Sequence, residues 1–186
     1  ARSGLGKISQ GGKVIQQSRR TFDHAINSPV GMCAMALFDA MPIGTQEGCS
    51  LIPDHIKSRV ERLFAAPGEG SDHAVSIASA SLNWLISIDP VWAEERLIPM
   101  LAFEHQASEP AWNGFLQGEQ VPPLSLLEII KPLLLAIFPW IEGLSWDRDL
   151  PMVAAQWLGS MRLAHANESR GLSSSEMRSV LRAMSD

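Results

Sequence analysis

The pattern of apolar and polar positions predicts a chain built almost entirely from short helices. Apolar residues recur every three to four positions in one stretch after another, and a polar residue, a proline or both open most of these stretches. The pattern is densest from Ser76 to His165, where the apolar stretches also carry tryptophan or phenylalanine. No run of alternating β-branched residues bounded by tight-turn residues predicts a strand.

Local start signals divide the chain into about nine helices. Serine or aspartate suits the N-cap position, and proline suits the first helical position, where its missing N–H costs nothing. Ser173 and Glu176 have the spacing of a capping box. Pro99 is expected to kink or end one helix, and Pro132 to bend another. The first predicted helix covers Lys13 to Ile26, and the later ones begin at Ser28-Pro29, Pro53, Asp72, Asp89-Pro90, Ser108, Ser125, Asp149 and Ser173. The helix that begins at Asp72 is predicted to continue through Ile86.

These elements predict an all-α fold with two possible architectures. One is an irregular α-solenoid of HEAT-like stacked helix pairs, and the other is a helical bundle. Residues 1–12 are rich in glycine and serine and are predicted to be a flexible N-terminal segment, followed by a single all-helical domain over 13–186. Because Ala1 is not a methionine and the last predicted helix stops abruptly at Asp186, we expect a fragment of a longer protein.

Composition and charge exclude several functional classes. The 186 residues are 46% hydrophobic and 19% charged, which is ordinary for a globular domain with a real core. A net charge of -5 without a basic face argues against nucleic-acid binding. The apolar run Leu133–Ile141 is broken by Pro139 and is far shorter than the roughly 20 residues of a membrane span. Two cysteines, Cys33 and Cys49, make no disulfide framework, so a cytoplasmic location is predicted.

No catalytic, cofactor-binding or metal site is predicted. The segment Gly6–Lys13 fails as a phosphate loop, because Gly12 stands where that motif needs lysine. The second helix has a predicted apolar face of Met32, Met35, Ala36, Leu37 and Ala40. Cys33 is assigned to this face and is expected in the core. Four of the five histidines follow an acidic residue, but adjacent helical residues point about 100° apart and do not form an acid–base pair. These pairs are Asp23-His24, Asp54-His55, Asp72-His73 and Glu104-His105.

The six tryptophans supply the one candidate surface. Most are expected between packed helices, because indole has a large apolar area and one N–H to satisfy. Trp140 and Trp146 lie on either side of Gly143, in a predicted loop, and are the candidate interaction surface.

Several short sequence segments occur in an order that resembles a known protein family. Together they resemble the large C-terminal helical domain of unknown function in sirtuin-like bacterial anti-phage defence proteins, over Phe22 to Met184. The residues that carry the resemblance are Ala25–Gly31 with Ala36-Leu37, Leu82–Leu85, Asp89–Ala93, Leu97–Leu101, Ala111–Leu116, Leu127 and Ile130–Leu134.

The resemblance implies a role in a larger bacterial defence protein. In such proteins the NAD-consuming sirtuin-like domain lies toward the N-terminus, and this chain has no βαβ pattern of that kind. Any NAD-consuming activity would therefore lie outside it. The helical part would sense a phage component, assemble the complex or restrain the enzyme.

We therefore expect a non-catalytic scaffold or sensor segment that contacts a protein partner or another domain of its parent chain, without nucleic acid or membrane. Two alternatives remain open. One is a small helical ligand-binding or enzymatic domain with a pocket lined by tryptophan and methionine, which Trp84, Trp92 and His105 clustered around a cavity would indicate. The other is a structural oligomerisation module, which an exposed apolar stripe on the helix over Leu124–Ile141 would indicate. A homo-oligomer is thus a further option.

Overall fold

A computed structural model describes residues 7–10, 13–16, 21–41, 51–118, 121–140 and 150–183. Within these ranges the predicted all-α class is confirmed, with one short hairpin as the exception. The helices are α1 (Phe22–Ile26), α2 (Pro29–Asp39), α3 (Asp54–Phe64), α4 (Gly70–Ala80), α5 (Leu82–Ile88), α6 (Pro90–Arg96), α7 (Ser108–Gln117), α8 (Leu124–Ile137), α9 (Leu150–Ala164) and α10 (Ser174–Ala183), with 3₁₀ turns η1 (Ile98–Leu101) and η2 (Phe138–Trp140).

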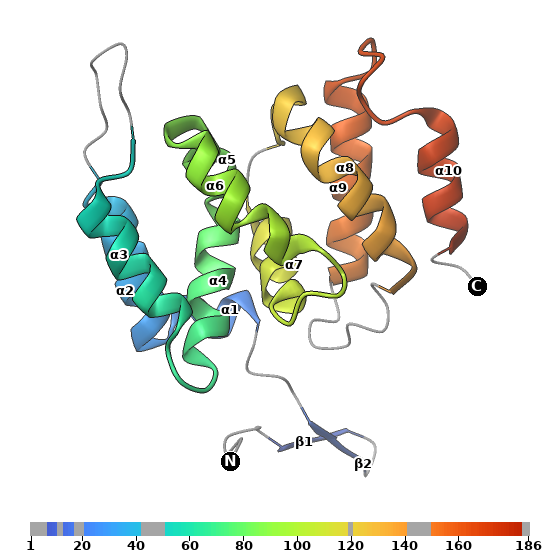
Figure 1. The fold of residues 1–186 in the computed structure, drawn as a ribbon. Coiled ribbons are helices and arrows are strands. Elements are labelled where there is room, and N and C mark those ends of the chain that lie inside the picture. The colour runs from blue at the N-terminus through green and yellow to red at the C-terminus, as the bar shows by residue number, and fades with distance from the viewer. Residues whose placement is uncertain are drawn as a thin grey trace.

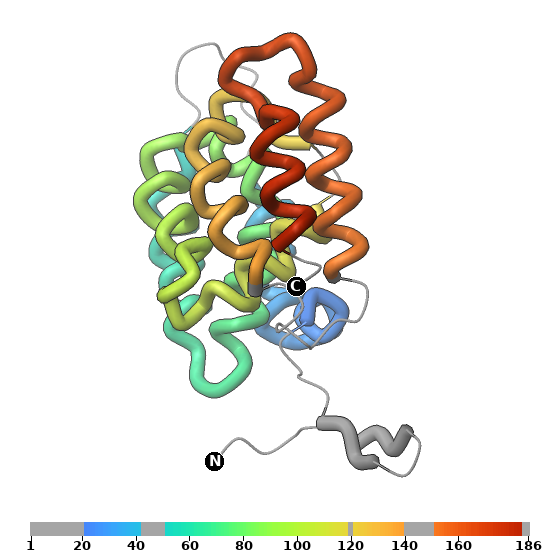
Figure 2. Tube along the Cα trace, turned by 90° about the vertical axis from the view of Figure 1, so that its right-hand side faces the viewer, coloured from blue at the N-terminus to red at the C-terminus, as the bar shows by residue number. Residues whose placement is uncertain are grey.

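The helices follow one another across the molecule in chain order. Figure 1 shows α2 and α3 at one end, α4 to α7 in the middle, and α8 to α10 at the other end. The turned view in Figure 2 shows α9 and α10 side by side nearest the viewer, in agreement with their contacts. This arrangement is compatible with either a helical bundle or a solenoid. No described helix has the length and apolar character needed to cross a membrane.

The centre of the fold is the packing of α4 against α7, the most extensive contact between any two elements. A Cβ built on Gly114 of α7 would lie 1.9 Å from the carbonyl oxygen of Ser76 on α4, so only glycine permits this approach. Beside it, the side chain of Asn113 accepts a hydrogen bond from the backbone N–H of Phe22, which ties α1 to α7. The two helices therefore pack backbone to backbone.

Three of the predicted helix starts are confirmed in detail. Ser28 caps α2 by accepting a hydrogen bond from the N–H of Gly31 at 2.9 Å, with Pro29 in the first position. Asp89 caps α6 in the same way. The capping box before α10 is complete: the N–H of Ser173 donates to Glu176 Oε2 at 2.8 Å, and the N–H of Glu176 donates to Ser173 Oγ at 3.1 Å.

The first predicted helix, Lys13–Ile26, is wrong at its start and right at its end, and residues 17–20 lie outside the described residues. Lys13–Gln16 is strand β2, which pairs antiparallel with β1 (Lys7–Gln10) in the register Ile8 to Ile15. β1 also lies in the segment that was expected to be flexible. The helix begins only at Phe22, because Thr21 caps α1 by accepting a hydrogen bond from the N–H of His24.

Two other predicted starts are shifted, and one predicted helix is divided. Asp72 lies inside α4, which begins at Gly70, and Ser125 lies inside α8, whose N-cap is Pro123. Ser108 is the first residue of α7, as predicted, although the N-cap is Ala107. Asp149 lies outside the described residues. The helix expected from Asp72 through Ile86 is two helices, α4 and α5, separated at Ser81. In contrast, α6 ends at Arg96 and the 3₁₀ turn η1 contains Pro99, as its proline predicted.

The predicted apolar face of α2 is also wrong. The side that packs against the core carries Gly31, Ala34 and Phe38, whereas Met32 is 56% exposed. Cys33 is exposed rather than buried. Because α2 is apolar on several sides, its sequence alone does not determine which side faces the core.

A buried carboxylate joins three segments near the start of α6. Asp89 is 1% exposed, and its Oδ2 lies 2.6 Å from the Nζ of Lys57 on α3. It also accepts hydrogen bonds from the backbone N–H of Ile52 and of Trp92, at 3.3 and 3.1 Å. The cap of α6 therefore also fixes α3 and the residues before it.

Candidate functional site

The described structure does not test the predicted surface of Trp140 and Trp146. Trp146 lies outside the described residues. The backbone of Trp140 ends the 3₁₀ turn η2, and its side chain lies outside the description. This pair of tryptophans therefore stays a sequence prediction.

The prediction that most tryptophans are core residues is confirmed for three of them. Trp92, Trp112 and Trp157 are buried. The indole N–H of Trp112 donates to the carbonyl of Leu101, and that of Trp157 donates to the carbonyl of Leu116, both at 2.8 Å. These tryptophans anchor neighbouring elements and are not available to a ligand.

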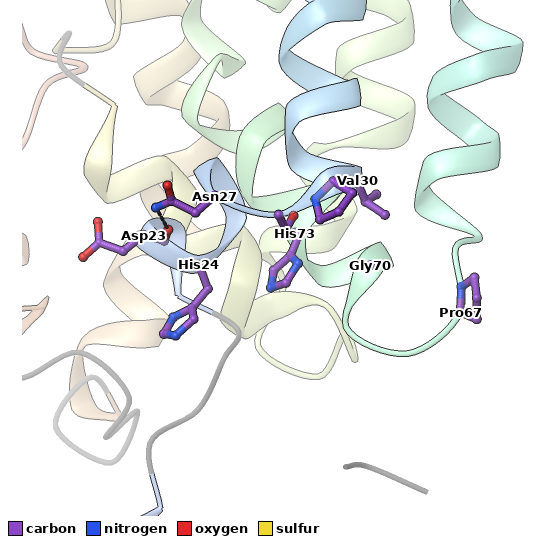
Figure 3. Close-up of a pocket in the computed structure, with 9 residues that line it drawn as sticks. Asp23, His24, Asn27, Val30, Pro67, Gly70 and His73 are labelled. Carbon is purple, nitrogen blue, oxygen red and sulfur yellow. Dashed lines mark hydrogen bonds between the residues drawn. The ribbon is translucent and has the colours of Figure 1, made fainter. Parts of the chain in front are cut away.

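One described cavity lies at the α1–α2 junction. It has a volume of about 550 Å³ and is lined by Asp23, His24, Asn27, Ser28, Pro29, Val30, Pro67, Gly70 and His73. Figure 3 shows the rings of His24 and His73 directed toward the same side of this junction pocket. The His24 ring contacts Thr21 Oγ1 at 2.7 Å, and the Asn27 amide donates to the Asp23 carbonyl at 2.7 Å.

The junction pocket offers two imidazoles and a carboxylate but no assembled reactive group. No cluster of three histidine, cysteine, aspartate or glutamate side chains within the described ranges could hold a metal ion. The polar groups Ser28 Oγ and Asn27 Nδ2 donate hydrogen bonds to backbone carbonyls of α1. These polar side chains therefore stabilise the local backbone at the α1–α2 junction.

A second cavity lies along the outer side of α10. It has a volume of about 450 Å³ and is lined by Ser175, Arg178, Ser179, Arg182 and Ala183. Arg178 donates through Nε to the carbonyl of Ser174 at 3.1 Å. Two arginines on one exposed helix are too few to indicate a nucleic-acid surface.

The third cavity lies between α5 and α6 on one side and α8 on the other, and is called the α5–α8 groove. Its volume is about 240 Å³. Sequence reasoning missed it, because its walls come from parts of the chain about 40 positions apart. It is lined by Asn83, Ile86, Ser87, Pro90, Glu94, Pro123, Ser125, Leu126 and Ile129.

The groove residue Ile129 also belongs to an apolar stripe along the outside of α8. Ile129, Pro132 and Ala136 are exposed and recur at helical spacing, opposite the buried side of the helix. Ile129 is 37% exposed, and Val91 beside the groove residue Pro90 is 63% exposed. A signal existed in the sequence: the outer side of α8 carries these three apolar residues beside Ser125 and Glu128, whereas the solvent side of an amphipathic helix is mainly polar.

None of the three cavities is lined by Trp84, Trp92 or His105, the cluster that would indicate a Trp/Met-walled ligand pocket. His105 instead accepts a hydrogen bond at Nδ1 from the backbone N–H of Ala107, just before α7. In comparisons with known proteins, no family model, curated protein or solved structure matches this chain.

Proposed function

We propose that this chain is a non-catalytic helical scaffold or sensor segment that contacts protein through the α5–α8 groove and the stripe on α8. The partner is either a separate protein or another domain of the parent chain. The observation that supports this is the apolar outer side of α8, because exposed apolar surface next to a groove is typical of protein contact sites.

The setting we propose is a cytoplasmic bacterial defence protein, as the resemblance of the sequence implies. In that setting the NAD-consuming reaction belongs to a domain outside this chain. The purified chain incubated with NAD is expected to release no nicotinamide, whereas the full-length parent does. Nicotinamide release by the chain alone would contradict the non-catalytic proposal.

The contact itself is tested by site-specific photocrosslinking in the parent protein. A benzophenone amino acid is placed at Ile129 in the groove and, as a control, at Leu163 on α9, which is 79% exposed. We expect position 129 to crosslink to one defined peptide and position 163 to give background only. Equal background at both positions would contradict the proposed interface.

The same stripe favours a second candidate, an oligomerisation module. Sedimentation velocity over a range of chain concentrations distinguishes the two. Self-association that Ile129→Glu abolishes would identify the occupant as a second copy. If the chain stays monomeric at all concentrations, the groove binds a segment of a different protein or of another domain of the parent chain.

A further inference from the structure

We propose that the α5–α8 groove is an anchoring pocket for a single arginine side chain presented by the protein partner. This inference rests on the interaction function proposed above and names the chemistry that the site recognises. The size of the groove, its apolar walls and its polar rim with one negative charge each restrict which side chain can bind there.

The size of the groove suits a single long side chain. Pockets for drug-sized ligands usually measure about 300–1,000 Å³. The groove, at about 240 Å³, is smaller than that range. Protein interfaces often place one large anchor residue in such a pocket, and arginine, tyrosine and tryptophan are the commonest anchors.

The walls of the groove are apolar and come from both sides. Ile86 and Pro90 lie on the α5–α6 side, and Leu126 and Ile129 lie on the α8 side. These walls suit the methylene groups of a long side chain, which arginine buries readily while its charged end stays near water. They would equally suit leucine or phenylalanine, so the polar rim decides between them.

The rim of the groove supplies hydrogen-bond acceptors and one negative charge. Glu94 lies one helical turn after Pro90 on α6, is exposed, and makes no ion pair with any residue in the described ranges. The Ser87 hydroxyl donates its hydrogen to the Trp84 carbonyl at 2.6 Å, which leaves its oxygen lone pairs to accept. Ser125 adds a second hydroxyl on the α8 side.

A guanidinium group matches this rim. It carries five N–H donors and no acceptor, and it pairs with a carboxylate through two parallel hydrogen bonds. No cationic residue lines the groove, so nothing within it already neutralises Glu94. A lysine ammonium matches the rim less well, because it is a compact and strongly hydrated charge.

Binding of small probes to the whole chain tests the proposal. The probes are the Nα-acetyl N-methylamides of arginine, citrulline and norleucine, each titrated while backbone amide shifts are followed by NMR. Citrulline has nearly the shape of arginine without its charge. We expect the arginine probe to shift the amides of Glu94 and Ile129, and to bind about threefold to fivefold more tightly than citrulline.

Two neighbouring carboxylates give a charge-matched pair of variants. Glu94→Gln should abolish the preference for arginine over citrulline. Glu95→Gln makes the same change in net charge at an exposed residue that does not line the groove, and should leave the preference intact. Equal binding of arginine and citrulline, or equal effects of the two variants, would overturn the arginine assignment.

The two proposals fail separately. If position 129 crosslinks to a partner but arginine has no advantage over citrulline, the interface stands and the anchor is wrong. If arginine binds at Glu94 but position 129 captures nothing, the pocket stands and the interface function is wrong.

Discussion

The Nζ of Lys57 lies 2.6 Å from the Oδ2 of Asp89, and this ion pair joins α3 to the cap of α6 at a buried carboxylate. Burial by itself raises the pKa of Asp89. The hydrogen bond and charge of Lys57, together with the N–H groups of Trp92 and Ile52, outweigh burial and hold that pKa below its ordinary value.

Replacing this carboxylate should destabilise the chain strongly. Asp89→Asn leaves the Lys57 ammonium beside a neutral amide, and losing one partner of a buried pair is expected to lower the free energy of unfolding by about 3 kcal/mol. Chemical denaturation at neutral pH measures the change. The control is Glu61→Gln, which removes an exposed pair with Arg96 and should cost less than about 1 kcal/mol. Similar losses in both variants would contradict the prediction.

The contribution of Asp89 should depend on pH in one direction. Its folded-state pKa is lower than its unfolded value of about 3.9, so its stabilising effect is complete above that value and disappears as the pH falls through the folded-state pKa. The stability difference between wild type and Asp89→Asn should therefore be constant from about pH 5 to 7 and shrink below about pH 4. A difference that grows in acid would show that the carboxylate is not stabilised by its partners.

Two glycine substitutions should have opposite effects. Gly114→Ala places a methyl group against the Ser76 carbonyl and should cost about 3 kcal/mol, because neither backbone can move without separating α4 from α7. Gly159→Ala in α9 meets no atom within 4 Å and should stabilise by about 0.5–1 kcal/mol through helix propensity. Thermal unfolding of the two variants measures both. If Gly114→Ala left the stability unchanged, α4 and α7 would pack less closely than described.

The exposed thiol of Cys33 should react in the folded protein. In a Cys49→Ser background, a disulfide reagent such as DTNB is expected to modify Cys33 at nearly the rate seen in denaturant, because no packing covers it. Protection by a factor of about 100 or more would correspond to burial and would contradict the exposed position.

The capping box should stabilise α10 locally. Ser173→Ala removes the acceptor for the N–H of Glu176 and is expected to cost about 1 kcal/mol. The amides of α10 should then exchange faster with deuterium, while those of α4 stay protected. Ser179→Ala, at an exposed position within α10, is the matched control and should leave exchange unchanged or slower.

The elements that the sequence predicted well are those with local causes. Three pairs, Ser28-Pro29, Asp89-Pro90 and Ser173 with Glu176, each begin a helix through side-chain hydrogen bonds to backbone N–H groups three residues away. Pro99 likewise limits α6 without help from distant residues. Such signals lie within one helical turn, so the order of residues is enough to find them.

Two other features, the buried side of α2 and the α5–α8 groove, were missed because they depend on distant contacts. Which side of α2 is buried, and hence the exposure of Cys33, depends on how α4 packs against it. The α5–α8 groove is lined by Ile86 and Ile129, which are 43 positions apart in the sequence. Periodicity along a single segment carries no information about either, because it does not say which neighbour covers which side.

The position of α4 has a consequence for synthesis on the ribosome. α1, α2 and α3 all pack against α4, yet α4 also needs α7 on its other side, and α7 ends 37 residues after α4. At a translation rate of about 5–20 residues per second, the N-terminal helices wait roughly 2–7 s for that partner. A nascent chain is therefore expected to develop folding force, measured with an arrest peptide, only once Gln117 has emerged.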